Sequence, residues 1–196
     1  MTRTDIPLFP LSTVLFPGGD LQLRIFERRY LDLVRDCARE DRGFGVCLIL
    51  EGSEAGAPAT PAAVGTLARI VDFDTLPDGL LGIRAHGGER FRVTSTRVRD
   101  NGLVHGEAES WPDEPVVPVP PEYALLATIL ERLFERIGGD AARVDRARYD
   151  DASWVGFRLA EQLPLQAAEK QHLLQITDPI ARLAQLTRDL PRFQAD

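Results

Sequence analysis

Lysine is almost absent from this chain, because Lys170 is the only lysine among its 23 basic residues. A Walker A loop needs a Gly-Lys-Ser/Thr sequence after a glycine-rich turn, and no glycine lies near Lys170. The sequence therefore excludes a P-loop ATPase. Ser-Lys catalysis would have to use the same lysine, which lies in a segment with the pattern of an amphipathic helix.

Cysteine and histidine are scarce as well, with two and three residues. Cys37 and Cys47 form no Cys-x-x-Cys pair, so we expect two small buried thiols in a reducing compartment. None of His86, His105 and His172 stands at metal-ligand spacing from another histidine or cysteine. We therefore expect no metal site and no cofactor.

The chain also lacks long apolar runs and an excess of basic charge. No run reaches the roughly 18 apolar residues of a membrane span, and the start MTRTDIPLFP lacks the apolar region of a secretory signal. We therefore expect a cytoplasmic protein. Residues 1–110 hold 16 acidic and 13 basic residues, and residues 111–196 hold 14 and 10. This acidic balance disfavours nucleic acid and anionic membrane surfaces as partners.

Residues 1–110 have the pattern of short strands separated by glycine and proline turns. We predict strands over residues 6–9, 13–16, 21–26, 44–50, 64–73, 80–85, 90–96 and 103–109. His86-Gly87-Gly88 separates two of these strands, and Asn101-Gly102 is a hairpin signal. One amphipathic helix is predicted over residues 28–39, and a mobile loop over residues 51–63. Seven or eight such strands indicate a curled or closed antiparallel sheet.

The remainder of the chain has the pattern of helices. Residues 111–121 hold five prolines and are predicted to form a semi-rigid extended connector. Helices are expected over residues 122–137, 152–163 and 165–176, and a last one begins with Asp178 as its cap and Pro179 at its first position. We therefore expect a β subdomain over residues 1–110, a connector over 111–121 and a small helical bundle over 122–196.

The first strands carry a long motif. Residues 6–30 read IPLFPLSTVLFPGGDLQLRIFERRY, followed by FGV at 44–46, GTLARI at 65–70 and GERF at 88–91. The tail adds LP at 163–164 and RL at 182–183. This order of motifs resembles the Lon substrate-binding (N-terminal) domain family, which includes the amino-terminal domain of Lon proteases and the Lon-like domain of cereblon. The resemblance covers about residues 5–190.

The resemblance implies an α+β fold, with a six-stranded PUA-like pseudo-barrel that holds one embedded helix and a C-terminal helical bundle after it. It also implies a standalone, non-catalytic module that recognises polypeptides and lacks the ATPase and protease modules of full Lon proteases. The expected partners are unfolded or degron-bearing polypeptides, or a protease or chaperone. The alternative is a small-ligand-binding protein or hydrolase that uses a cavity between barrel and helices.

Four aromatic residues of these motifs are candidates for peptide binding: Phe16, Phe26, Tyr30 and Trp111. Phe16, before Pro17, either forms a rigid exposed lip or fills the barrel. Trp111 opens the connector, where it either packs between the two parts or anchors a ligand. An extended segment would bind in a shallow apolar groove by adding a strand to the sheet.

Three charged residues are expected to stabilise the fold: Glu27, Arg29 and Arg90. Glu27 stands where a strand meets a helix, and such a corner leaves backbone N–H groups without partners. We expect Glu27 to satisfy those groups or to pair with Arg29 or Arg90. Asp72 and Asp74 would place two carboxylates on one face of a strand, but they approach a turn and are expected to be exposed.

Overall fold

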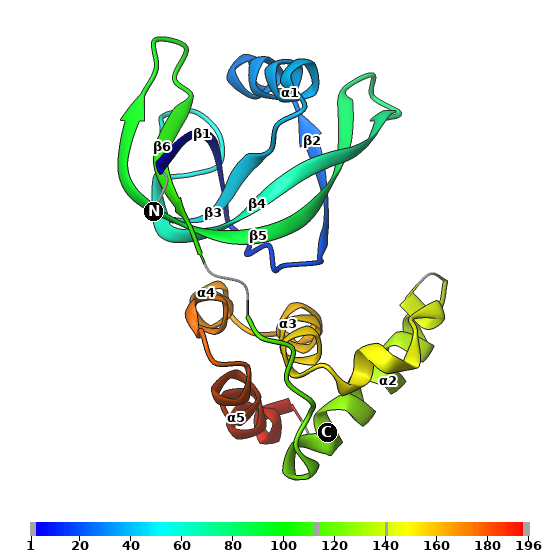
Figure 1. Cartoon of the computed structure of the whole chain (residues 1–196). Helices are drawn as coiled ribbons and strands as arrows, with labels where there is room; N and C mark the ends of the chain where they lie inside the picture. The colour runs from blue at the N-terminus through cyan, green and yellow to red at the C-terminus, as the bar shows by residue number, and fades with distance from the viewer. Residues whose placement is uncertain (1–2, 112–113, 140, 194–196) are drawn as a thin grey trace. The chain divides into compact units, whose positions relative to one another are not determined.

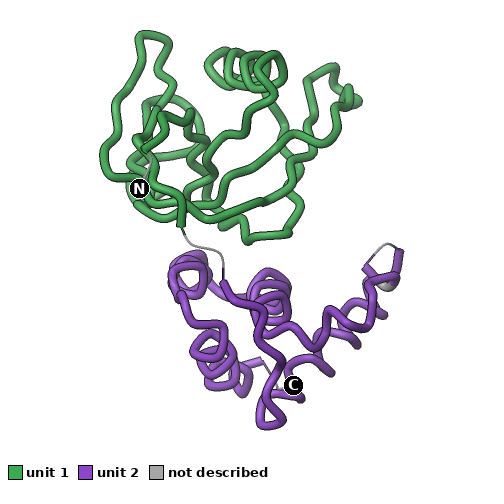
Figure 2. The backbone as a smooth tube through the Cα atoms, in the orientation of Figure 1, with its two compact units in different colours: residues 1–113 green, residues 114–196 purple. Residues whose placement is uncertain are grey.

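The computed structural model describes residues 3–111, 114–139 and 141–193. The chain divides into two compact units, residues 1–113 and residues 114–196 (Figure 2). Residues 112 and 113, which belong to the predicted connector, lie outside the described residues. The two units are described separately.

Unit 1 is a six-stranded sheet with one helix. Its elements are β1 (Arg3–Leu11), β2 (Asp20–Ile25), α1 (Arg28–Glu40), β3 (Phe44–Glu51), β4 (Thr60–Thr75), β5 (Leu81–Val98) and β6 (Val104–Ser110). The strand order is β2-β5-β4-β3-β1-β6, and an additional pairing of β5 with β6 curls the sheet back on itself (Figure 1). The α+β class, the barrel-like sheet and the embedded helix are therefore confirmed.

Side chains on the two faces of each strand enter different clusters of buried residues. On β1, Phe9 and Leu11 point into the cluster that includes α1, whereas Leu8 points into a second cluster with Phe91. This separation follows from the two-residue period of a strand. The α1 cluster also receives side chains from β2, β3, β4 and β5, so it positions the start of α1 against the sheet.

The apolar stripe of α1 explains why this segment is a helix. Tyr30, Leu33, Val34 and Cys37 recur at helical spacing and are all buried, while the charged residues other than the buried Arg29 lie on the other face. The helix ends at Asp41, which has a left-handed backbone with φ of 45°. The predicted bounds agree with the observed ones to within one residue.

Two strand predictions are wrong. Residues 80–85 and 90–96 were predicted as separate strands, but they belong to the single strand β5, which continues through Gly87 and Gly88. Residues 13–16 form no strand: the hydroxyl of Thr66 donates to the carbonyl of Leu15 at 2.6 Å, and residues 14–16 are buried without regular secondary structure. The described sheet has six strands rather than seven or eight.

Unit 2 contains four α-helices and several short 3₁₀ turns. The helices are α2 (Ala124–Ile137), α3 (Ala152–Gln162), α4 (Ala167–Gln175) and α5 (Pro179–Asp189). The side chain of Asp178 accepts from the N–H of Ile180, and Pro179 occupies the first turn, as predicted. Gly138 follows α2 with φ of 72°, so this helix ends at a glycine directly after its predicted last residue 137. The helices after the sheet are therefore those that the sequence indicates.

Much of the described connector packs on the helices of unit 2. The N–H of Val119 donates to the carbonyl of Asp150, and the N–H of Ala152 donates to the carbonyl of Val117, both at 2.9 Å. Glu114 forms a buried ion pair with Arg182, whose guanidinium also lies 3.8 Å from the ring centre of Phe157. The sequence predicts an extended connector over residues 111–121, but these contacts attach residues 114–119 to the helical bundle.

Both cysteines are free and buried, as the sequence analysis predicts. Within the described ranges, no helix is long and apolar enough to cross a membrane.

Candidate functional site

A hollow of about 240 Å³ lies where β2 ends and α1 begins. Two of the four candidate peptide-binding residues line it, Phe26 and Tyr30, together with the motif residue Glu27. We call this hollow the β2 groove. Its lining residues are Phe9, Leu11, Gln22, Leu23, Arg24, Phe26, Glu27, Tyr30 and Glu54.

The floor of the β2 groove is apolar and rigid. The ring of Tyr30 stacks on the ring of Phe9, with centroids 3.9 Å apart and planes inclined by 9°. Leu11 extends the same surface from β1, and all three residues are buried. Burial raises the pKa of Tyr30, so this ring is a neutral packing surface at physiological pH. Phe26 behaves differently: its side chain is 58% exposed and stands at the rim.

One end of the β2 groove is polar. Arg29 is buried and donates to the carboxylate of Glu27 at 3.2 Å and to the carbonyl of Gly102 at 3.3 Å. Its guanidinium also lies 4.7 Å from the ring centre of Tyr30. Glu27 makes no side-chain hydrogen bond to the helix start. Of the three roles expected for Glu27, the pair with Arg29 is confirmed and the helix-start cap is wrong.

The loop before β4 closes the polar end of the groove. Glu54 accepts from the backbone N–H of Ser12 at 2.6 Å, and its own carbonyl accepts from Arg29 at 3.3 Å. The N–H of Gly56 donates to Glu27 at 3.4 Å. This segment was predicted as a mobile loop over residues 51–63, but β4 begins at residue 60, and these bonds attach the loop to the rim.

The groove runs along an unpaired strand edge. Among the residues that the structure describes, β2 pairs with β5 only, so it is an edge of the sheet. Across the groove, β1 pairs with β6 from Arg3 to Pro7 but not over its last residues, where it pairs with β3 alone. Alternate N–H and C=O groups of an edge strand are open to a further strand. The β2 groove therefore combines an apolar floor with backbone groups that can accept an extended chain.

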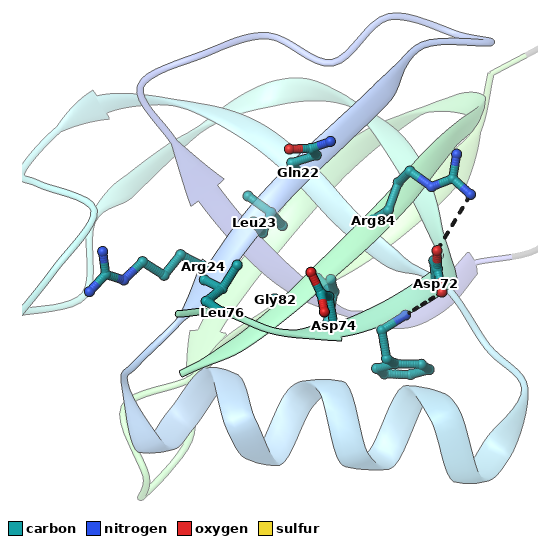
Figure 3. A pocket seen from close by; sticks show the side chains of 10 residues that line it. Gln22, Leu23, Arg24, Asp72, Asp74, Leu76, Gly82 and Arg84 are labelled. Atoms are coloured by element: carbon teal, nitrogen blue, oxygen red, sulfur yellow. Dashed lines mark hydrogen bonds and ion pairs between the residues drawn. The ribbon is translucent and has the colours of Figure 1, made fainter. Parts of the chain in front are cut away.

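A second, larger hollow of about 640 Å³ lies on the polar face of β2, β4 and β5 (Figure 3). Arg84 pairs with Asp72 at 3.7 Å, and Asp72 also accepts from the N–H of Phe73 at 2.9 Å. Arg24 pairs with Asp78. Asp72 and Asp74 are exposed, as expected. The charges here pair with one another at the surface, so the arrangement does not resemble a pair of catalytic carboxylates.

The remaining predicted site residues lie away from the β2 groove. Phe16 is fully buried, so the exposed lip is wrong and the alternative, a side chain inside the fold, is confirmed. Arg90 is buried, and its guanidinium lies 5.7 Å from the ring centre of Trp111. The backbone N–H of Trp111 donates to the carbonyl of Arg90 at 2.9 Å. Arg90, in the middle of β5, and Trp111, directly after β6, thus pack together and do not join Phe26 and Tyr30.

His105 is a buried titratable residue whose environment the sequence did not reveal. Its Nδ1 lies 3.1 Å from Oδ2 of Asp5, which also accepts from Arg97 at 2.7 Å and from Arg99 at 3.5 Å. Burial lowers the pKa of His105, and the two arginines add to that effect, whereas Asp5 opposes it. Asp5 lies about 90 to 100 residues before the other three in the sequence, so no local pattern could have shown the cluster.

No described group supplies an activated thiol or a metal site. Burial raises the pKa of Cys37 to about 11 and that of Cys47 to about 12, so both thiols are protonated at neutral pH. In residues 3–111, 114–139 and 141–193, no three His, Cys, Asp or Glu side chains converge in a way that could hold a metal ion.

Comparison with known proteins gives a family match over nearly the whole chain. The model of the ATP-dependent protease La (LON) substrate-binding domain matches residues 5–191. A crystal structure of a Lon N-terminal domain protein from Xanthomonas campestris superposes with a TM-score of 0.80 and 50% identity, covering 94% of this chain and 98% of that one.

Two curated relatives carry the same region within longer proteins. A LON peptidase N-terminal domain and RING finger protein of Schizosaccharomyces pombe is 26% identical over 91% of this chain and 43% of its own length. Protein cereblon of Danio rerio is 28% identical over 59% of this chain and 27% of its own length. The chain thus spans less than half the length of either relative.

Proposed function

Because the chain belongs to the Lon substrate-binding domain family, we propose that it is a non-catalytic module that recognises polypeptide segments through the β2 groove. The observation that carries this proposal is the position of a buried aromatic floor beside an unpaired strand edge. Neither feature alone selects a polypeptide, since apolar hollows also bind small molecules. Together they match both parts of an extended chain, its backbone and its side chains.

The bound segment would lie antiparallel or parallel to β2 and add a strand to the sheet. Its main-chain groups would bond to β2, and every second side chain would face the floor made by Phe9, Leu11 and Tyr30. Phe26 would cover an apolar side chain from the rim. This mode selects extended segments with apolar residues at alternate positions, as unfolded or degron-bearing polypeptides present them.

The proposal extends to partners and location. The names of the relatives place such a domain with a peptidase or a RING finger, which supports a protease or chaperone as a second partner. Two free buried thiols support a reducing, cytoplasmic compartment. The sequence has no Walker A loop, so recognition by this chain itself would be ATP-independent. The alternative of a small-ligand-binding protein or hydrolase stays a prediction.

The test is a binding titration with fluorescein-labelled extended peptides that alternate apolar and polar residues. Phe26→Ala should weaken binding by about fivefold to tenfold, because it removes the exposed aromatic rim. Leu125→Ala is the matched control, since Leu125 is 60% exposed on α2 and Phe26 58% exposed. Two further peptides carry N-methyl groups at the odd or at the even positions. Only the peptide whose methyl groups replace the N–H groups that bond to β2 should lose binding. Equal affinity for both variants, or no binding above background, would overturn the proposal.

A further inference from the structure

The first five residues of β2 are complementary to the same five residues read in the opposite direction. Asp20-Leu21-Gln22-Leu23-Arg24 has an acid and a base at its ends, a leucine inside each and an amide at the centre. We propose that β2 pairs antiparallel with β2 of a second copy of this chain. The resulting two-fold dimer covers the edge to which a polypeptide would bind.

The backbone of β2 permits this pairing. All six residues of β2 pair with β5 on one side, from Asp20 opposite His86 to Ile25 opposite Leu81. In the described part of the chain no strand pairs with its other side, which is a free edge in Figure 1. Exposed edges usually carry charges that oppose association with another edge. Here the charges have opposite signs at the two ends of the strand, so a second β2 in reverse direction meets attraction.

Antiparallel pairing centred on Gln22 gives each of residues 20–24 a partner of matching chemistry. It places Asp20 opposite Arg24 of the second copy, and by symmetry this ion pair forms twice. Leu21 stands opposite Leu23 of the second copy, again twice. A shift of the register by two residues puts a charge opposite Gln22 and loses both ion pairs. The side-chain pattern therefore specifies one register. An edge with uniform side chains would allow several registers.

Asp20 and Arg24 each already have a neighbour of opposite charge, or one that can take up such a charge, within unit 1. His86 Nδ1 lies 2.7 Å from Oδ1 of Asp20, and Arg24 pairs with Asp78. In the dimer each Asp20 would lie between His86 of its own chain and Arg24 of the other. In Figure 3 the guanidinium of Arg24 extends away from β5, whereas Arg84 and Asp72 meet on the other side of the strand. The side chains of Asp20 and Arg24 are 53% and 60% exposed, so neither loses much hydration on pairing.

The leucines give the pairing an apolar contribution. Leu21 and Leu23 are partly buried against the α1 cluster, on the face opposite Gln22. A second copy would shield their remaining exposed surface. Because only one short strand from each chain takes part, the dimer is of the weak, transient class, with association at high micromolar to millimolar concentration. Self-pairing and peptide binding compete for one edge, and this consequence alone rests on the proposed function.

The test uses sedimentation velocity from about 10 µM to about 1 mM, at low salt. Wild type should shift from monomer to dimer over this range. Asp20→Arg puts like charges opposite each other in the dimer, as does Arg24→Asp, so each variant should associate at least about tenfold more weakly. An equimolar mixture of the two variants restores both ion pairs and should dimerise. The double variant D20R/R24D should dimerise with itself.

The rescue by mixing separates a specific contact from a folding defect. Circular dichroism spectra and thermal melts of each variant give the folding control, and Arg84→Asp on β5 is the matched charge reversal outside the edge. Monomeric wild type at about 1 mM would overturn the proposal, as would a dimer that both single variants leave unchanged or a mixture that stays monomeric. Wild type that stays monomeric at about 1 mM but still binds the peptide would refute the self-pairing and leave the proposed function standing.

Discussion

Arg29 shows how one buried side chain joins three parts of unit 1. Its guanidinium reaches Glu27 at the helix start, the carbonyl of Gly102 before β6 and the carbonyl of Glu54 in the loop before β4. A buried guanidinium is stable only when its donors have acceptors, and an anionic acceptor contributes most. Glu27 is therefore a structural residue of the groove, and it supports Phe26 and Tyr30 from behind.

Replacement of Glu27 should destabilise unit 1. Glu27→Ala leaves Arg29 with carbonyl acceptors only, so we expect the free energy of unfolding to fall by about 1–3 kcal/mol. Urea melts followed by circular dichroism measure the change. Glu40→Ala on the same helix is the control, because its exposed pairs contribute less than about 0.5 kcal/mol. A loss below about 0.5 kcal/mol for Glu27→Ala would contradict the structural role.

His105 should make stability depend on pH. Burial and the arginines Arg97 and Arg99 hold its pKa below the usual value of 6.5, against the opposing effect of Asp5. A lowered pKa in the folded state means that the unfolded chain takes up the proton first. The contribution to stability is therefore complete above pH 6.5 and is lost as pH falls through the folded pKa.

Urea melts at several pH values below about 6.5 test this account of His105. His105→Gln should flatten the fall of unfolding free energy in that range, because glutamine still reaches Asp5 but does not titrate. The same slope in wild type and in His105→Gln would show that His105 contributes nothing to it.

At the scale of elements, glycine positions explain where strand predictions from the sequence failed. His86-Gly87-Gly88 resembles a turn signal, yet β5 continues through it. A Cβ on Gly87 would lie 2.6 Å from the carbonyl oxygen of Phe16, so this glycine permits a close approach of two backbones. A glycine in a turn and a glycine that allows a close approach of two backbones look the same in the sequence. Only the distant segment at residue 16 shows that Gly87 is of the second kind.

Gly87→Ala should therefore destabilise the sheet, whereas its neighbour should tolerate the same change. At Gly87 the backbone of Phe16 or of β5 must move, which costs about 1–3 kcal/mol of unfolding free energy. At Gly88 the nearest atom to a new Cβ is the carbonyl oxygen of Leu67 at 3.4 Å, an ordinary contact, so we expect a change within about 0.5 kcal/mol. Similar melting of both variants would refute the close approach as the reason for the glycine.

Helices and local motifs were predicted better than long-range contacts. The amphipathic helix at residues 28–39 and the Asp178-Pro179 start of α5 depend on residues near in sequence, and both are confirmed. The expected apolar stripe of that helix is wrong in part, because Leu31 and Ala38 are exposed and Leu33 and Cys37 are buried instead. Phe26, Glu27 and Tyr30 lie together because they are neighbours in the chain. Phe9 and Glu54 reach the same groove only through strand pairing and loop contacts, and the burial of Phe16 depends on β4 and β5. Periodicity could not identify those three.

At the scale of the whole molecule, a recognition function requires a surface that stays available after folding. Unit 1 buries its strands on two clusters and pairs most of their edges, and β2 is the exception at the end of the sheet. The chain has a net charge of −7, which disfavours nucleic acid on that surface. The family match and the free edge both support the proposal that this chain is a module that binds other polypeptide chains.

Hydrogen–deuterium exchange with and without a saturating extended peptide tests this conclusion most directly. At about 10 µM protein, where self-pairing is dissociated, the account predicts slower exchange of the β2 amides and of the first turn of α1. The amides of α3 in unit 2 are the internal reference and should not change. Peptide binding with unchanged exchange across β2, or with protection confined to unit 2, would contradict the account.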